Sequence, residues 1–71
     1  MGMDRLLARL EDPRPFRVGE LAEYTGYSVP TIRKLLDSGA LPGVRLGPLR
    51  ERRIPVQEAR RVLVDLRILQ D

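Results

Sequence analysis

The stretch EYTGYSVPTIRKLL, residues 23–36, has the apolar spacing of a helix but contains Gly26 and Pro30. A proline inside a helix removes an amide donor and clashes with the preceding turn, which costs about 3 kcal/mol. That cost is absent in the first turn, because the amides there have no partner within the helix. Ser28, two residues before Pro30, is a preferred N-cap. The stretch therefore predicts two helices, the first ending at Gly26 and the second beginning at Val29.

The apolar spacing around this junction defines both helices. Residues 18–24 place Val18, Leu21 and Ala22 on one face, and residues 29–38 turn Ile32, Leu35 and Leu36 toward a core. Gly39 is a natural end for the second helix. Two short helices joined by a turn that contains glycine form a helix-turn-helix unit.

The flanking sequence predicts two more helices and a hairpin. Met3, Leu6, Leu7 and Leu10 follow the spacing of an amphipathic helix that ends at residues 12–13, and residues 12–16 read as a stiff connector. Residues 44–46 and 52–54 form short extended runs around a Gly-Pro turn, which predicts a β-hairpin. A last helix is expected over residues 56–69, with its apolar side toward the core.

Composition excludes several classes of protein. The chain contains no cysteine and no histidine, which removes the usual zinc ligands and the thiol and Ser-His nucleophiles. We therefore expect no metal, no cofactor and no enzymatic activity. The longest apolar run has three residues, so a membrane span and the apolar core of a signal peptide are both excluded. We expect a cytoplasmic protein, encoded by a bacterium or a phage.

The net charge of +3 is concentrated in one part of the chain. Residues 13–55 hold eight basic and four acidic residues, whereas residues 1–12 sum to −1 and residues 56–71 to zero. Such a concentration indicates a surface that binds a polyanion. Twelve of the thirteen basic residues are arginine, whose planar guanidinium suits phosphate and guanine contacts.

The order of these elements defines the fold class. Two helices, a basic hairpin and a closing helix are the order of a winged helix-turn-helix, so we expect a mainly α protein with a small β-hairpin wing. Residues 1–12 would form an extra N-terminal helix and residues 13–71 the DNA-binding domain. In this arrangement the second helix of the pair enters the major groove, and residues near its start reach base edges.

The sequence resembles a known superfamily. RVGELAEYTGYSVPTIRKLLDSGALP is similar to the DNA-binding module of mercury-resistance-type (MerR) regulators and to the stand-alone excisionase-type relatives of that superfamily. The similarity covers residues 16–69 and is carried by VGELA at 18–22, TGYSVPTIR at 25–33, GALP at 39–42 and RRIP at 52–55. MerR regulators continue into a dimerisation helix and an effector domain, whereas this sequence stops at Asp71. We therefore expect no inducer-sensing or metal-responsive mechanism.

The resemblance and the helix geometry together indicate the residues that contact DNA. In the recognition helix and its cap they are Ser28, Pro30, Thr31, Arg33 and Lys34, and in the wing they are Arg45, Arg50, Arg52 and Arg53. Arg17, just before the first helix of the pair, and Tyr24 are candidates for the DNA backbone. MerR modules often carry a basic residue where Pro30 stands, so specificity would depend on Thr31, Arg33, Lys34 and the wing.

Three functions fit these features. The first is a sequence-specific transcription regulator on double-stranded DNA, and the second is an excisionase that bends DNA at attachment sites. Either would bind one site weakly and repeated sites cooperatively, since a small module buries little area. The third is a protein-interaction module that binds a polymerase, a recombinase or a host enzyme. An apolar strip at Val64 and Ile68 needs a cover, which is either the N-terminal helix or a second subunit that also contacts Leu6 and Leu10.

Overall fold

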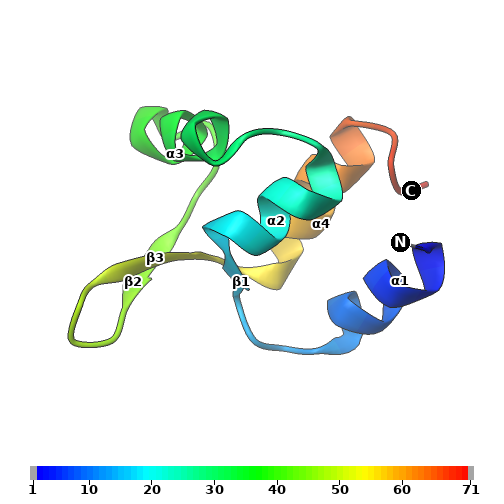
Figure 1. The fold of residues 1–71 in the computed structure, drawn as a ribbon, viewed down its shortest axis with the longest axis horizontal. Coiled ribbons are helices and arrows are strands. Elements are labelled where there is room, and N and C mark those ends of the chain that lie inside the picture. Colours follow the sequence, from blue (N-terminus) through cyan, green and yellow to red (C-terminus); the bar gives the residue numbers. More distant parts are fainter. Residues whose placement is uncertain (1, 71) are drawn as a thin grey trace.

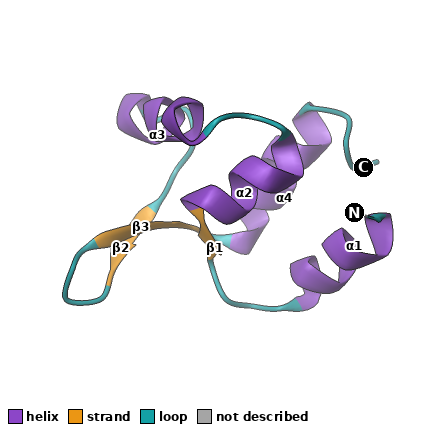
Figure 2. Cartoon of the chain, viewed as in Figure 1, coloured by secondary structure: helices purple, strands orange, loops and turns teal. Residues whose placement is uncertain are grey.

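The computed structural model describes residues 2–70 and contains four helices and three short strands (Figure 1). In chain order the elements are α1 (Met3–Glu11), β1 (Phe16–Arg17), α2 (Val18–Thr25), α3 (Val29–Ser38), β2 (Val44–Leu46), β3 (Glu51–Ile54) and α4 (Val56–Asp65). The helices dominate, and the strands are confined to the wing and its base (Figure 2). The expected fold class, a mainly α winged helix-turn-helix with an additional N-terminal helix, is confirmed.

The junction between α2 and α3 has the predicted construction. Gly26 adopts a left-handed φ of 81° and its N–H donates to the carbonyl of Ala22 over 2.9 Å. Ser28 is the N-cap of α3, its hydroxyl oxygen accepting the N–H of Thr31 over 3.2 Å, and Pro30 lies in the first turn. Residues 23–36 therefore belong to two intact helices, which are joined by a three-residue turn from 26 to 28.

The sheet contains one strand more than the predicted hairpin. Its order is β1-β3-β2, both pairings are antiparallel, and Phe16 lies opposite Ile54 in the β1–β3 register. Residues 12–16 are thus not only a connector, because Phe16 begins a strand. A two-residue strand is too short to show alternation in the sequence. It ties the base of the wing to the start of α2.

The wing approaches α3 closely at Gly43. A β-carbon built at Gly43 would lie 2.7 Å from Leu36 Cδ2 and 3.1 Å from the carbonyl oxygen of Arg53. The absence of a side chain therefore lets the chain pass between α3 and β3 at Gly43, just before β2. This close passage sets the position of the wing relative to the recognition helix.

A single core joins all four helices. Its members are Leu6, Leu10, Phe16, Leu21, Ala22, Ile32, Leu41, Ile54, Ala59, Val62, Leu63 and Leu69. From α1, Leu6 and Leu10 are buried while Met3 and Leu7 remain exposed. Burial of Ile32 is as expected, but Leu35 and Leu36 are only half-buried.

The last helix is shorter than predicted. α4 ends at Asp65 instead of residue 69, and Arg67 takes a left-handed φ of 61°. The N–H groups of Ile68 and Leu69 both donate to the carbonyl of Leu63, over 2.9 and 3.1 Å, and so close the helix end. The apolar spacing continued past the end because Leu69 still packs into the core after the chain turns. Spacing alone therefore overestimated the helix.

The apolar strip on α4 and the turn after it is covered from within the chain. Val64 and Ile68 are half-buried against the core, and Ile68 lies beside Met3 and Leu6 of α1. A dimer through Leu6 and Leu10 would have to open this core, because both are buried inside the chain. α1 therefore lies at the Ile68 end of the strip.

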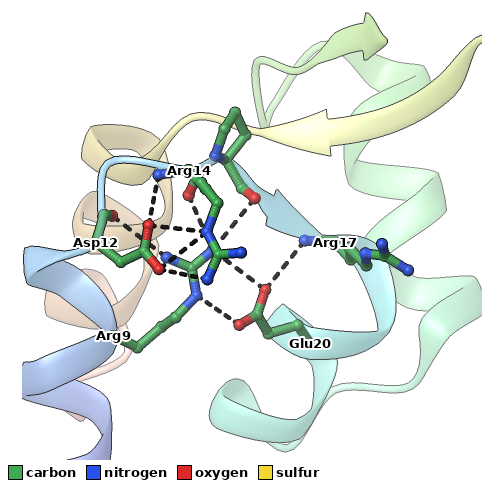
Figure 3. A network of polar contacts seen from close by, with 6 residues as sticks. Arg9, Asp12, Arg14, Arg17 and Glu20 are labelled. Carbon is green, nitrogen blue, oxygen red and sulfur yellow. Dashed lines mark hydrogen bonds and ion pairs between the residues drawn. The ribbon is translucent and has the colours of Figure 1, made fainter. Parts of the chain in front are cut away.

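Arg9 joins α1 to the start of α2 (Figure 3). Its Nε lies 2.5 Å from a carboxylate oxygen of Glu20, and its Nη2 donates to the carbonyls of Arg14 and Pro15 over 2.9 and 3.2 Å. The guanidinium also stands 4.0 Å from the centre of the Phe16 ring, within the range of a cation–π contact. Glu20 in turn accepts the N–H of Arg17 at the start of α2. One side chain therefore holds the helix, the connector and the strand together.

Candidate nucleic-acid interface

The recognition helix α3 presents its predicted contact residues to solvent. Ile32 faces the core, whereas all five predicted residues are exposed: Ser28, Pro30, Thr31, Arg33 and Lys34. The hydroxyl groups of Ser28 and Thr31 lie 2.9 Å apart and are hydrogen-bonded to each other. Ser28 is thus occupied as a cap, which leaves Thr31, Arg33 and Lys34 as the projecting side chains of the first turns.

We define the wing as residues 44–54. A cationic hollow lies between α3 and this wing. Six arginines line it, together with Val18 and only two carboxylates: Arg17, Arg33, Arg45, Arg50, Arg52, Arg53, Asp37 and Glu51. These residues come from β1, the start of α2, α3, the wing strands and the wing loop. The fold therefore brings together five of the predicted wing and recognition-helix arginines with the predicted backbone-contact residue Arg17.

Two of these arginines are held in place by the carboxylates. Arg52 Nη2 lies 2.5 Å from Asp37 on α3, and Arg53 Nη2 lies 2.7 Å from Glu51 on the same strand. The Arg53 guanidinium, hydrogen-bonded to the Glu51 carboxylate, lowers the pKa of Glu51. Asp37 and Glu51 thus orient two cations while leaving the hollow positive.

The remaining arginines carry uncompensated charge. Within residues 2–70, Arg17, Arg33, Arg45 and Arg50 form no ion pair with a carboxylate. Arg45 donates from Nη1 to the carbonyl of Arg50 over 3.2 Å, a bond across the wing that leaves its charge free. All four are exposed. Such side chains can exchange water and counterions for phosphate oxygens at little cost.

Tyr24 is not brought to this hollow. Its ring packs edge-to-face on Phe16, with centroids 6.2 Å apart and planes at 75°. It lines a different depression with Met3, Glu23 and Ile68. The expectation that Tyr24 contacts the DNA backbone therefore has no support from its position, and the side chain serves packing.

The sequence did not indicate Asp37 and Glu51 as members of the site. Glu51 stands two residues before Arg53 on one strand, a spacing that places both side chains on the same face and was a usable signal. Asp37 meets Arg52 only because the wing folds back on α3. No local pattern predicts a contact of that kind.

Within residues 2–70 no group of three or more acidic side chains is arranged to hold a metal ion. In the same part of the chain, no helix has both the length and the apolar character needed to cross a membrane.

The fold and the hollow define a class of protein. An exposed helix of a helix-turn-helix pair beside a cationic wing is the arrangement of winged helix-turn-helix nucleic-acid-binding proteins. The sequence model of a family described as "Helix-turn-helix domain" matches residues 16–63, which extends from β1 into α4. The chain belongs to this family and is a small DNA-binding protein. Searches of curated proteins and of solved structures gave no match.

Proposed function

We propose that the chain is a sequence-specific regulator that binds double-stranded DNA with α3 in the major groove and the wing on the flanking backbone. The observation that carries this proposal is the cationic hollow, where six arginines from α3, β1 and the wing face the same space. The major groove is wide enough for a helix, and base edges there are distinguishable.

Each part of the surface has a role in this proposal. Thr31, Arg33 and Lys34 project from the exposed start of α3 and read base edges. Arg17, Arg45 and Arg50 carry free charge and neutralise phosphates, while Arg52 and Arg53 do so in orientations fixed by their carboxylate partners. The N-terminus of α3 adds the positive end of its helix dipole, although Pro30 has no N–H and the N–H of Thr31 already donates to Ser28.

The biological role we favour is transcription regulation of the MerR-like type, with excision at attachment sites as the alternative. Both begin with the same contacts, and they differ in the sites that are bound. An excisionase acts at attachment sites and a regulator at promoters, so the location of the bound sites separates the two. Cooperative binding to repeated sites is expected for either, because one module of this size buries a modest area.

The third reading, a protein-interaction module, has less support. That reading places the partner on Leu6, Leu10, Val64 and Ile68, yet Leu6 and Leu10 are buried and Val64 and Ile68 are half-buried against the chain's own core. The cationic hollow, by contrast, is open to solvent on a fold whose family binds DNA.

A salt series of gel shifts tests the proposal. Arg45→Ala should lower the slope of log affinity against log salt by about 1, because one phosphate contact is lost. Arg33→Ala should cost about 1–3 kcal/mol and relax specificity at one base pair. Arg60→Ala is the matched control, since Arg60 is an exposed arginine on α4 outside the hollow and should change neither quantity. Absence of duplex binding at low salt would refute the proposal.

A further inference from the structure

The tip of the wing carries the most exposed large apolar side chain of residues 2–70. Leu49 is 80% exposed, whereas the next is Met3 at 48%. It lies in the turn of residues 47–50, which we call the wing tip, where the N–H of Arg50 donates to the carbonyl of Gly47 over 3.1 Å. The wing projects away from α1, α2 and α4 (Figure 1). The core therefore does not use Leu49.

The backbone of the wing tip is closed into a turn by hydrogen bonds. Pro48 precedes Leu49 and fixes its own φ near −65°. Gly47 and Arg50 take left-handed φ values of 76° and 56°, and Arg45 donates to the carbonyl of Arg50 across the base of the turn. The leucine is thus presented on a constrained turn, and little freedom remains to be lost when it is buried.

The charge around the tip selects the partner. Arg50 follows Leu49 in the chain and Arg45 donates to the Arg50 carbonyl, and neither arginine has a carboxylate partner within residues 2–70. Glu51, which lines a shallow depression together with Leu49, is paired with Arg53. An apolar protein surface would gain nothing from two unpaired guanidinium groups. A groove of duplex DNA would satisfy the arginines and the leucine at once. Its phosphates would pair with the guanidinium groups, and the space between its stacked bases would take the apolar side chain.

We propose that Pro48 and Leu49 form an apolar wedge that enters the minor groove beside the major groove occupied by α3, and partly unstacks one base step. This proposal rests on the DNA binding proposed above. The minor groove, about 6 Å wide, is too narrow for a helix but admits a slender turn, and its potential attracts arginine. Apolar side chains inserted there kink the duplex by about 20–90°. The wing tip would therefore bend the site as well as hold it.

The test uses the full chain and a duplex carrying a site that the wild-type chain selects from random-sequence DNA. Fluorescent dyes on the duplex ends report bending by energy transfer, and 2-aminopurine placed at successive steps reports unstacking. The variants are Leu49→Ala, which removes the wedge, and Leu49→Met, which keeps a long apolar side chain. Leu7→Ala is the matched control, since Leu7 is an exposed leucine on α1, remote from the wing.

The expected results separate the wedge from the charge contacts. Leu49→Ala should abolish the bend and the 2-aminopurine signal and weaken binding about tenfold, with an unchanged salt slope, because no phosphate contact is lost. Leu49→Met should retain most of the bend, of the 2-aminopurine signal and of the affinity. Leu7→Ala should match the wild type in all of these measurements. Circular dichroism should show every variant folded, since neither leucine is in the core.

Three outcomes would overturn the proposal. An unchanged bend and 2-aminopurine signal in Leu49→Ala would show that the wing tip is not a wedge. If Arg45→Ala still lowered the salt slope, the proposed DNA binding would stand without the wedge. Loss of cooperativity on repeated sites, with single-site bending intact, would assign Leu49 to a contact between neighbouring copies. Absence of duplex binding by the wild type would remove the wedge and the proposed function together.

Discussion

The side chain of Arg9 is 12% exposed and that of Arg14 is 82% exposed, although both are arginines close together in the chain. Arg9 binds the Glu20 carboxylate and two backbone carbonyls and covers the Phe16 ring. Arg14 forms an exposed pair with Asp12, and its side-chain and backbone hydrogen bonds lower the pKa of Asp12 to about 2. A count of charges from the sequence gives both arginines the same weight. At the residue scale, the partners decide whether a guanidinium holds the fold or lies free on the surface.

Replacing Arg9 with alanine should lower the free energy of unfolding by about 2 kcal/mol. The variant loses a charge-assisted bond to Glu20 and a cation–π contact, and it leaves the carbonyls of Arg14 and Pro15 without their donor. Arg9→Lys should not restore the loss, because an ammonium group cannot present the planar fork that meets all these acceptors. Urea denaturation followed by circular dichroism measures the effect.

The control for Arg9 is Arg5→Ala, which removes the same charge from an exposed position on the same helix. Its free energy of unfolding should change by less than about 0.5 kcal/mol. Equal losses in the two variants would mean that helix charge, and not the Arg9 contacts, stabilises the docking of α1.

At the scale of elements, local chemistry predicted the α2–α3 junction, whereas β1 and the end of α4 left no such local signal. Gly26, Ser28 and Pro30 each carry a backbone preference that holds in any context, so the two helices could be located from sequence. The two residues of β1 form a strand only because β3 pairs with them. After the end of α4, Arg67 adopts a left-handed backbone conformation. Arginine has no preference for that conformation, so the sequence did not predict where the helix ends.

Ser28→Ala should lower the free energy of unfolding by about 1 kcal/mol. The hydroxyl that accepts the N–H of Thr31 and bonds its side chain would be lost, and the first turn of α3 would fray. Ser28→Asp should keep the stability, since aspartate is an equally good cap and its charge suits a helix N-terminus. Thermal denaturation of both variants measures the cap.

The same pair of variants separates the cap from the DNA contact. On the proposed surface, the carboxylate introduced by Ser28→Asp would face phosphates, so this variant should bind duplex more weakly than Ser28→Ala despite its higher stability. Gel shifts at one salt concentration decide the matter. Equal binding by the two variants would place Ser28 outside the DNA interface and leave it only its structural role.

At the scale of the whole molecule, the candidate site is a product of chain topology. The recognition-helix residues were predictable because exposure on α3 follows from the burial of Ile32. The recognition-helix residues lie near Arg17 and the wing because β1 pairs with β3 and because the chain passes close to α3 at Gly43. Neither contact can be predicted from a short apolar pattern. The sequence could therefore indicate most members of the hollow but not the ion pair between Asp37 and Arg52.

The proposed division into an N-terminal helix, residues 1–12, and a domain, residues 13–71, also belongs at this scale. Leu6 and Leu10 belong to the same core as Phe16 and Leu63, so α1 is a part of the domain's packing and not an appendage. A chain starting at residue 13 would lose the burial of two leucines, worth about 1.5–3 kcal/mol each, and the Arg9 contacts. That sum is comparable with the whole stability of a small domain.

A chain of residues 13–71 should therefore be largely unfolded at 25 °C in the absence of DNA, with little helical signal by circular dichroism. It should gain helical structure when duplex is added. The shortened chain keeps the exposed face of α3 and the wing, and binding of DNA to these surfaces stabilises the folded state by mass action. The full chain is the reference for the folded signal. A sharp thermal transition of residues 13–71 alone, close to that of the full chain, would contradict this account and make α1 an independent element.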